Sequence, residues 1–476
     1  MLREVKTHQA WITRGARMKY RTLKMSVVAV SCSLAFSVSA ESILFTNVNV
    51  FDGKKDELLE NYQVLVVDNK ISKVSSEAIS AQGAKVIDGK GMTLMPGLIE
   101  GHGHLQMNGT SLPDIENNRN WEELAARSAA RANSALLSGF TTWRDAGGMG
   151  AGLKKTIDSG ELIGPRIYPS GAFIGPTGSH ADFRNFNTPN ETFYGHNSSG
   201  GRLGMSCTAD SIGDIKACAR QNYMQGATQI KLMSSGGVAS SFDPWQLNAY
   251  SLEELQAAVE VADAYGSYAM SHAYSKVSLL RNLEAGVKTL EHAFMFDKDV
   301  YKAMKKNDAY MTTNMTAFSP YLGEIEAINS NPASARKAKT AQAAFGNYID
   351  NVNKYKPKLG FHVDCVGGVA ACEQQADHSI YLSGKFFGNH YTLISMTSVN
   401  GEIVKLAGEV LDPYFEGKLG VVEEGAYADL LLVDGNPLED LSVIGANEKW
   451  FDAPKRDGIE TMKIIMKDGV IYKNTL

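Results

Sequence analysis

Cysteine, proline and long apolar runs are scarce in this chain of 476 residues, which has 5 cysteines and 13 prolines. None of the cysteines forms a CxxC pair, so the sequence gives no sign of a cysteine-based zinc site. The most apolar run without a charge, residues 25–36, is too short to cross a hydrocarbon core of about 30 Å as a stable helix. The sequence therefore indicates neither a membrane span nor, lacking any short repeat, a repeat architecture.

The run 25–36 has the surroundings of a secretory signal peptide. Basic residues precede it, and the small residues 37–40 (SVSA) follow it, as a signal peptidase requires. We expect cleavage after Ala40 and a periplasmic or secreted mature chain; a buried core helix is the alternative interpretation. Because a start at Met18 would give a signal of ordinary length, residues 1–17 are interpreted as an over-extended start.

Charge excludes two classes of partner. The chain has 47 basic and 52 acidic residues, and the balance becomes more negative once residues 1–40, which hold seven basic residues and one acidic residue, are removed. An acidic chain is a poor match for nucleic acid or an anionic membrane. Hydrophobic residues make up 44% of the chain, which is typical of a globular protein with a large core. The sequence leaves a homo-oligomer open.

Four cysteines remain after the signal peptide. An even number in an exported chain permits disulfides, and the two short-range pairs Cys207–Cys218 and Cys365–Cys372 give the simplest connectivity. Four buried thiols are the alternative.

Both ends of the chain are rich in β patterns. Apolar or alternating runs with β-branched residues occur at 43–52, 62–67, 84–95, 429–434 and 462–473, the last a hairpin with Asp468-Gly469 at its turn. We therefore predict a small β-sandwich domain built from residues 41–95 and 406–476.

The middle of the chain alternates strand and helix patterns. A helix is expected at 251–265, where Ser251 and Glu254 suit a capping box. Eight strands are expected, at 94–101, 139–145, 166–173, 227–233, 267–273, 287–293, 309–316 and 358–364. Eight βα units predict an α/β protein with a (β/α)₈ TIM barrel over residues 96–405.

Candidate metal ligands follow the expected strands. His102 and His104 are two apart after the first strand, so both imidazoles can face one metal. Lys231 lies in the fourth strand, where an uncompensated ammonium is costly to bury. Carboxylation of its amine by CO₂ would turn it into an anion able to bridge two cations. The alternatives are surface histidines and an ion-paired lysine.

His272, His292 and Asp364 end the fifth, sixth and eighth strands. Each alone is more often structural, but the carboxyl ends of all strands in a (β/α)₈ barrel open onto one face. Together with the first three residues they offer nitrogen and oxygen donors to two divalent ions, and zinc is the expected metal.

These segments resemble the amidohydrolase superfamily. PGLIEGHGH, GFTTWRDAGG, TLEHAF and GKLGVVEEGAYADLLLVDGNPL carry the resemblance, which covers essentially the whole mature chain. TGSHADFR and IKLMSSGGVASSFDP resemble its prolidase-like branch of Xaa-Pro dipeptidases and related carboxypeptidases. The resemblance implies that His102, His104 and Asp364 hold the inner ion, that His272 and His292 hold the outer one, and that carboxylated Lys231 bridges them.

The eighth strand departs from the family pattern. The family usually reads Gly-Thr-Asp there, whereas this chain has His362-Val363-Asp364, followed by Cys365. The aspartate is kept but its neighbours differ. Ser179 also replaces a usual glycine.

The expected chemistry is metal-assisted amide hydrolysis. Asp364 would take a proton from the attacking water and pass it to the leaving amine. The resemblance implies that Tyr274 donates a hydrogen bond to the developing oxyanion and that His180 orients the substrate carboxylate. The backbone amide of Val238 is a further expected substrate contact. Tyr274 as plain packing is the alternative.

We predict a binuclear amidohydrolase that cleaves dipeptides or N-acyl amino acids next to a C-terminal residue, with Xaa-Pro favoured. Hydrolysis of a cyclic amide, as in imidazolonepropionase-like relatives, or deamination is the alternative enzyme class, although such relatives usually lack the bridging lysine. A non-catalytic binding protein is disfavoured by the intact ligand set.

Overall fold

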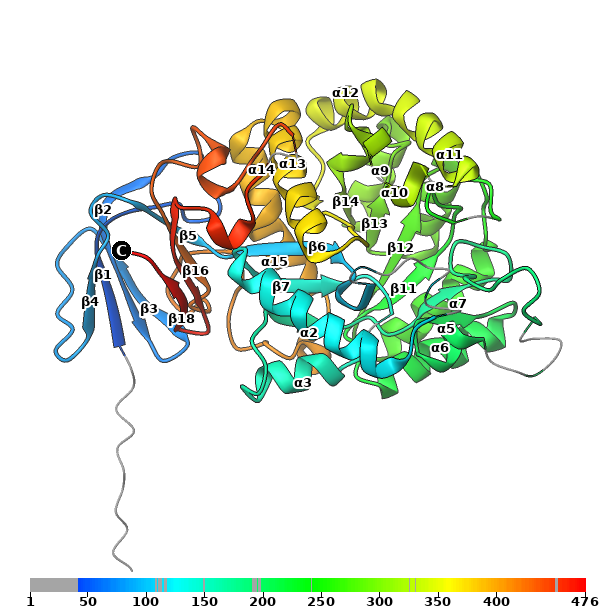
Figure 1. Ribbon diagram of the computed structural model, residues 1–476, viewed down its shortest axis with the longest axis horizontal. Coiled ribbons are helices and arrows are strands. Elements are labelled where there is room, and N and C mark those ends of the chain that lie inside the picture. The colour runs from blue at the N-terminus through cyan, green and yellow to red at the C-terminus, as the bar shows by residue number, and fades with distance from the viewer. Residues whose placement is uncertain are drawn as a thin grey trace, which may run out of the picture. The chain divides into compact units, whose positions relative to one another are not determined.

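Strands from both ends of the chain share one sheet, blue and red in Figure 1. The computed structural model describes residues 42–476 apart from 108, 110–113, 115–117, 149, 191–194, 196–197, 241, 325, 330 and 450–452. The predicted signal peptide lies outside the described residues. The sheet runs β18-β17-β16-β5-β1-β2-β3, with β4 beside β1. Its strands are β1 (Ser42–Val50), β2 (Leu59–Val67), β3 (Lys70–Ser75), β4 (Lys85–Asp88), β5 (Thr93–Pro96), β16 (Leu430–Val433), β17 (Met462–Lys467) and β18 (Val470–Asn474).

The pairing of β5 with β16 joins the two ends of the chain. The two strands are antiparallel, with Leu94 opposite Leu432. At the hairpin between β17 and β18, Asp468 and Gly469 have φ values of 58° and 74°, as the predicted tight turn needs. The strands from both ends thus meet as expected, in a single eight-stranded sheet. The two packed layers of a sandwich stay a prediction, and so do the domain boundaries, because residues 41–476 form one compact unit.

The middle of the chain supplies two parallel sheets, ordered β6-β7-β8 and β10-β9-β11-β12-β13-β14-β15. This α/β arrangement is consistent with a TIM barrel. The described strands do not form one continuous ladder, so closure of the barrel stays a prediction. The strands are β6 (Leu98–Gly103), β7 (Phe140–Asp145), β8 (Arg166–Tyr168), β9 (Phe173–Gly175), β10 (Ser206–Thr208), β11 (Ile230–Met233), β12 (Ala269–Ala273), β13 (Thr289–His292), β14 (Tyr310–Thr313) and β15 (Leu359–Phe361).

Buried amide side chains connect the two parallel sheets. Asn400 donates to the carbonyl oxygens of Ile99 in β6 and Phe361 in β15, at 2.7 and 2.8 Å. Gln229, just before β11, donates to the carbonyl oxygens of Tyr168 in β8 and Asp145 in β7. These side chains supply hydrogen bonds where the backbone ladders stop, which keeps the polar groups at the sheet edges satisfied.

The third strand of the middle region differs from its prediction. A single strand was expected at 166–173, but the chain breaks between β8 and β9, and the two pieces join different sheets. Pro169 has no N–H to donate to a ladder. Gly171 has a φ of +73°, and a side chain there would collide with Asn222, whose amide bonds both backbone groups of Ala172. The break therefore has a local cause in the sequence.

Along the chain, helices alternate with most of the parallel strands, and in space they pack over the outside of these strands (Figure 1). The predicted capping box is confirmed, since Ser251 and Glu254 bond each other's backbone N–H at the start of α7. Among the described residues no helix combines the length and apolar character needed to cross a membrane. The helices are α2 (Trp121–Leu137), α3 (Gly152–Asp158), α5 (Ser199–Arg202), α6 (Ile212–Met224), α7 (Leu252–Ala264), α8 (Lys276–Ala285), α9 (Lys298–Asn307), α10 (Glu326–Asn329), α11 (Pro332–Ala343), α12 (Phe345–Tyr355), α13 (Val369–Phe387), α14 (Asn389–Met396), α15 (Ser398–Lys405) and α16 (Gly408–Leu411), with short 3₁₀ turns η1 (Leu105–Met107), η2 (Met315–Phe318), η3 (Leu322–Glu324), η4 (Leu441–Ile444) and η6 (Arg456–Gly458).

Candidate metal centre and active site

The structure brings the six predicted metal ligands together at the carboxyl ends of the parallel strands. The pairing of neighbouring strands explains part of this convergence, because Met233 at the end of β11 lies opposite His272, and Ala273 of β12 lies opposite His292. The six residues are His102 in β6, His104 directly after it, Lys231 in β11, His272 in β12, His292 at the end of β13 and Asp364 three residues after β15.

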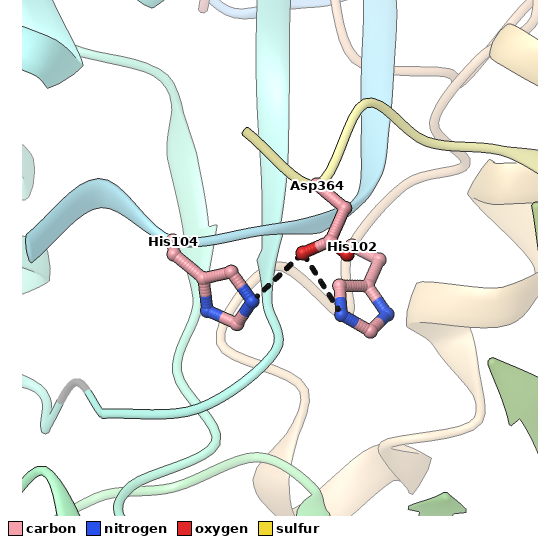
Figure 2. Close-up of side chains that lie close together, drawn as sticks. All are labelled: His102, His104 and Asp364. Atoms are coloured by element: carbon pink, nitrogen blue, oxygen red, sulfur yellow. Dashed lines mark ion pairs between the residues drawn. The ribbon is translucent and has the colours of Figure 1, made fainter. Parts of the chain in front are cut away.

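Asp364 lies at the centre of the cluster (Figure 2). Its Oδ1 is 3.1 Å from His104 Nε2 and 3.6 Å from His102 Nε2, so both imidazoles point at one carboxylate oxygen. Its Oδ2 is 4.0 Å from His292 Nε2. The ligand atoms of His102, His104 and Asp364 all lie within 4.8 Å of one another, close enough to hold a metal ion.

His272 lies on the other side of His292. The ring centroids of these two residues are 4.6 Å apart. The Nε2 of His272 is 3.1 Å from the carbonyl oxygen of Gly236, which leaves Nδ1 as the free nitrogen donor. The imidazole rings thus extend from His104, past Asp364 and His292, to His272.

Lys231 is fully buried, and its Nζ is 3.2 Å from His102 Nε2. Burial lowers the pKa of this amine to about 8, although Glu291 and Asp364 favour its charged form. The lowered pKa leaves a larger share of neutral amine, the form that reacts with CO₂, than an exposed lysine has. The amine thus lies against a ring nitrogen of His102 inside the cluster.

Asp364 is charged at neutral pH. Burial alone would raise the pKa of its carboxyl, but the hydrogen bond with His104 and the neighbouring His292 lower that pKa below its usual range. Its side chain is 23% exposed while the imidazoles around it are almost completely buried. A carboxylate that contacts the cluster and also reaches solvent can act both as a metal ligand and as a proton acceptor.

His292 and Asp364 share an unusual backbone conformation. Their φ values are 72° and 55°, in the left-handed region that side chains other than glycine rarely adopt. Such strain persists only where the surrounding structure holds it in place, and it is common at ligand-binding positions.

A buried carboxylate fixes the orientation of His102. Glu291 Oε2 accepts a hydrogen bond from His102 Nδ1 at 2.7 Å, so the Nε2 lone pair faces the cluster. Arg144 donates to both oxygens of Glu291, at 2.8 and 2.7 Å, and the hydroxyls of Thr289 and Thr312 donate to them as well. This arrangement is a carboxylate–histidine pair of the kind that commonly supports metal sites.

The other histidine ligands are oriented in the same way. The Nδ1 of His104 is 3.3 Å from the carbonyl oxygen of Gly147, and the Nδ1 of His292 is 3.4 Å from Asn314 Oδ1. Each ring therefore has one nitrogen bonded to a protein acceptor and presents the other to the cluster. The donor set fits divalent metal, with one lone pair from each of four imidazoles plus the Asp364 carboxylate.

The predicted substrate residues border the cluster on the side of His272. The ring of His180 lies 4.4 Å from that of His272, and the ring of Tyr274 lies 4.5 Å from it. Burial raises the pKa of the Tyr274 phenol above its usual range, while its hydrogen bond with the Val238 backbone opposes the shift. A phenol that keeps its proton is suited to donate a hydrogen bond.

A loop after β11 holds His180 in place. Ser240 Oγ lies 2.8 Å from His180 Nδ1, and the buried Lys337 of α11 donates to the carbonyl oxygens of Ser240 and Asp243. Asp243 in turn accepts the Gly237 N–H at 2.7 Å. Lys337 thus connects a helix distant in sequence to the residues around the expected substrate.

Sequence reasoning missed the residues that orient the ligands. Glu291, Arg144 and Glu100 are charged, yet every residue of the strands that carry them, β13, β7 and β6, is buried. Glu100 accepts N–H groups from His102 and Val363, and burial raises its pKa to about 8. Glu291 directly before His292 and Glu100 two residues before His102 were signals available in the sequence, whereas Arg144 precedes no candidate ligand.

Both predicted disulfides are present among the four cysteines, Cys207–Cys218 and Cys365–Cys372. The first joins β10 to α6. The second joins the residue after Asp364 to the first turn of α13. The second disulfide therefore constrains the loop that carries the central carboxylate.

Comparisons with known proteins agree with this geometry. The family model described as "Amidohydrolase family" matches residues 93–471. The ochratoxinase of Aspergillus niger is 27% identical over 434 residues, which are 88% of this chain and 84% of that protein. A prolidase solved in complex with N-methylphosphonate-L-proline is 30% identical, with a TM-score of 0.79 over 91% of this chain and 100% of that one. A Xaa-Pro dipeptidase with methionine in its active site is 25% identical, with a TM-score of 0.75 over the same shares. The chain belongs to the amidohydrolase family and is a hydrolase that acts on amide C–N bonds.

Proposed function

We propose that this protein hydrolyses the amide bond next to the C-terminal residue of dipeptides or N-acyl amino acids, with Xaa-Pro dipeptides favoured. The observation that carries the proposal is the convergence of four oriented imidazoles, a buried lysine and the Asp364 carboxylate. The similar prolidase and Xaa-Pro dipeptidase structures support the choice of substrate.

The metal centre we propose has two divalent ions, zinc being the expected metal. His102, His104 and Asp364 would hold one ion, His272 and His292 the other, and Lys231, carboxylated on Nζ, would bridge them. Bound metal would polarise the scissile carbonyl and lower the pKa of the attacking water. The support is that each imidazole in the set has one ring nitrogen held by a protein acceptor, which leaves its other nitrogen for a bond to metal.

The protein side chains have distinct roles in the proposed reaction. Asp364 accepts the proton of the attacking water and donates it to the leaving amine. Tyr274 donates a hydrogen bond to the oxygen that becomes negative. His180, held by Ser240, and the backbone N–H of Val238 bind the substrate carboxylate. The roles of His180 and Tyr274 are supported by the contacts of their rings with the ring of His272, and that of His180 also by its hydrogen bond with Ser240.

We further propose that the chain is exported, with cleavage after Ala40, and that it acts in the periplasm or outside the cell. The two disulfides support this location because disulfides persist in oxidising compartments. We also propose that β6 to β15 close into a (β/α)₈ barrel and that the eight-stranded sheet folds into a sandwich. The Asn400 and Gln229 bridges between the parallel sheets support barrel closure.

A substrate screen tests the function. Zinc-loaded protein, prepared with bicarbonate, is incubated with a library of dipeptides, N-acyl amino acids and cyclic amides, and released amino acid is measured. The proposal expects cleavage of Xaa-Pro dipeptides, with Asp364→Asn inactive as the control. Turnover confined to cyclic amides, or release of ammonia in place of an amino acid, would refute the proposal in favour of the alternative enzyme classes.

A further inference from the structure

His362 is a buried imidazole in the middle of the metal-binding cluster, to which neither the fold nor the proposed reaction gives a role. It follows β15 directly and is completely buried. Its ring centroid lies 4.6 Å from that of His102 and 5.1 Å from that of His292.

The hydrogen bonding of His362 sets it apart from the other histidines of the cluster. Each of the four predicted histidine ligands has one ring nitrogen bonded to a protein acceptor. Neither nitrogen of His362 has a hydrogen-bond partner in the described part of the chain, although both are buried. A buried polar group without a partner destabilises a fold, so a native protein normally supplies a partner from protein, water or a bound ion.

The nearest carboxylates constrain which partner is available. Glu291 already accepts hydrogen bonds from Arg144, His102, Thr289 and Thr312, so its acceptor positions are filled. In contrast, the ligand atoms of His362, His292 and Asp364 all lie within 4.8 Å of one another, which is close enough for one ion to contact all three. The geometry therefore directs His362 toward a cation.

The backbone beside His362 is held in position. The N–H of Val363, the next residue, donates to both oxygens of Glu100, at 3.0 and 3.2 Å. The same Glu100 accepts the N–H of His102. One buried carboxyl group thus fixes the distance between the strand that carries His102 and the strand that carries His362, as a shared metal site requires.

We propose that His362 is a further nitrogen ligand of the metal centre, at a position where one ion can contact His362, His292 and Asp364 together. Asp364 would then contact the ion held by His272 and His292 as well as the one held by His102 and His104. This inference rests on the proposed metal centre, because it needs an ion at that position. Imidazole is a preferred ligand of zinc and neighbouring transition metals, so one more imidazole would tighten binding of such a metal.

Metal binding tests the proposal directly. His362→Ala is compared with wild type and with His378→Ala, a matched control that removes another fully buried histidine, which hydrogen bonds to Ser319 in a different part of the fold. Metal-free proteins are titrated with Zn²⁺ against a chromophoric chelator, and with Co²⁺ while its visible absorption is recorded. Thermal unfolding of the metal-free proteins establishes that each variant is folded.

We expect His362→Ala to weaken binding of one ion by roughly 10- to 100-fold, to change the Co²⁺ spectrum, and to recover part of the affinity when imidazole is added. His378→Ala should bind metal as wild type does. Affinity and spectrum unchanged in His362→Ala would overturn the inference while leaving the metal centre intact. Wild-type protein that binds no metal would overturn both.

A crystal structure of the zinc-loaded wild-type protein tests the inference if the alanine variant fails to fold. We expect a ring nitrogen of His362 at about 2.0–2.1 Å from zinc, the usual length of such a bond. A separation beyond 3 Å, with the imidazole bonded to water or to the Lys231 side chain instead, would refute the inference.

Discussion

The two disulfides provide a sharp test of how the Asp364 loop supports the reaction. They close short loops, with sequence separations of 7 for Cys365–Cys372 and 11 for Cys207–Cys218. In the chain-entropy model, loops of these lengths contribute about 2.4 and about 2.8 kcal/mol respectively. The two bonds are therefore nearly equal as sources of stability, but only Cys365–Cys372 is adjacent to Asp364.

The perturbation is a pair of double variants, Cys365→Ala/Cys372→Ala and Cys207→Ala/Cys218→Ala. Proteins unfold with an entropy of about 2.1 cal/mol/K per residue, and roughly 435 residues follow position 41. Dividing the lost stabilisation free energy of either disulfide by this total entropy gives a fall in Tm of about 3 °C. Tm is measured on metal-free protein at a fixed scan rate, so that differences in metal affinity between the variants do not affect the comparison.

Activity should separate the two variants. Loss of Cys365–Cys372 frees the loop after Asp364 from α13, and a displacement of about 1 Å in a reacting group can cost about 100-fold in rate. We expect kcat/KM on the best substrate of the screen to fall roughly 10- to 100-fold in that variant and to stay within about twofold in the other. Equal activity losses would refute the reasoning, and so would wild-type activity in the Cys365→Ala/Cys372→Ala protein.

Four further outcomes are expected. Asp364→Asn should remain folded and lose roughly 10²- to 10⁴-fold in kcat, measured at saturating substrate; activity within a few fold of wild type would mean that another group is the base. Lys231→Ala should lose metal, measured by elemental analysis, and regain part of its activity with short carboxylic acids, whereas a fully active alanine variant would contradict the bridging role. Glu291→Gln leaves the buried Arg144 without its anion, so we expect roughly 10- to 100-fold weaker metal binding and a metal-free protein destabilised by about 3–5 kcal/mol, seen as a lower Tm. Glu100 has a folded-state pKa of about 8, above its unfolded value, so the folded state holds a proton that the unfolded chain releases; stability should fall as pH rises from about 4.5 to 8, and the Tm of Glu100→Gln, plotted against pH, should lack that part of the fall.

The convergence of the candidate ligands could be predicted from the sequence because each lies in or shortly after a recognisable strand. His102 and His104 follow an apolar run, and His292 and Asp364 end other such runs, so the parallel arrangement alone brings them to one face. The disulfide pairing was also predictable, since each pair is close in sequence.

The parts that the sequence did not predict depend on contacts between distant segments. Glu291 orients His102 across 189 positions, and Lys337 reaches Ser240 across 97. No local sequence pattern marks such pairs, because the residues that flank each partner are typical of a strand or helix. The division of the third strand was missed because its cause, the Asn222 side chain against Gly171, comes from a helix about fifty positions later.

The pairing of β5 with β16 bears on the order in which the chain can fold. Leu94 meets Leu432 in that pairing, more than 300 residues later. At a synthesis rate of about 5–20 residues per second, β5 waits roughly 17–70 seconds before its partner strand exists. During that interval one edge of β5 has unpaired N–H and C=O groups, an arrangement that invites association with other strands. The sheet can therefore be completed only after the parallel strands between β5 and β16 have been made.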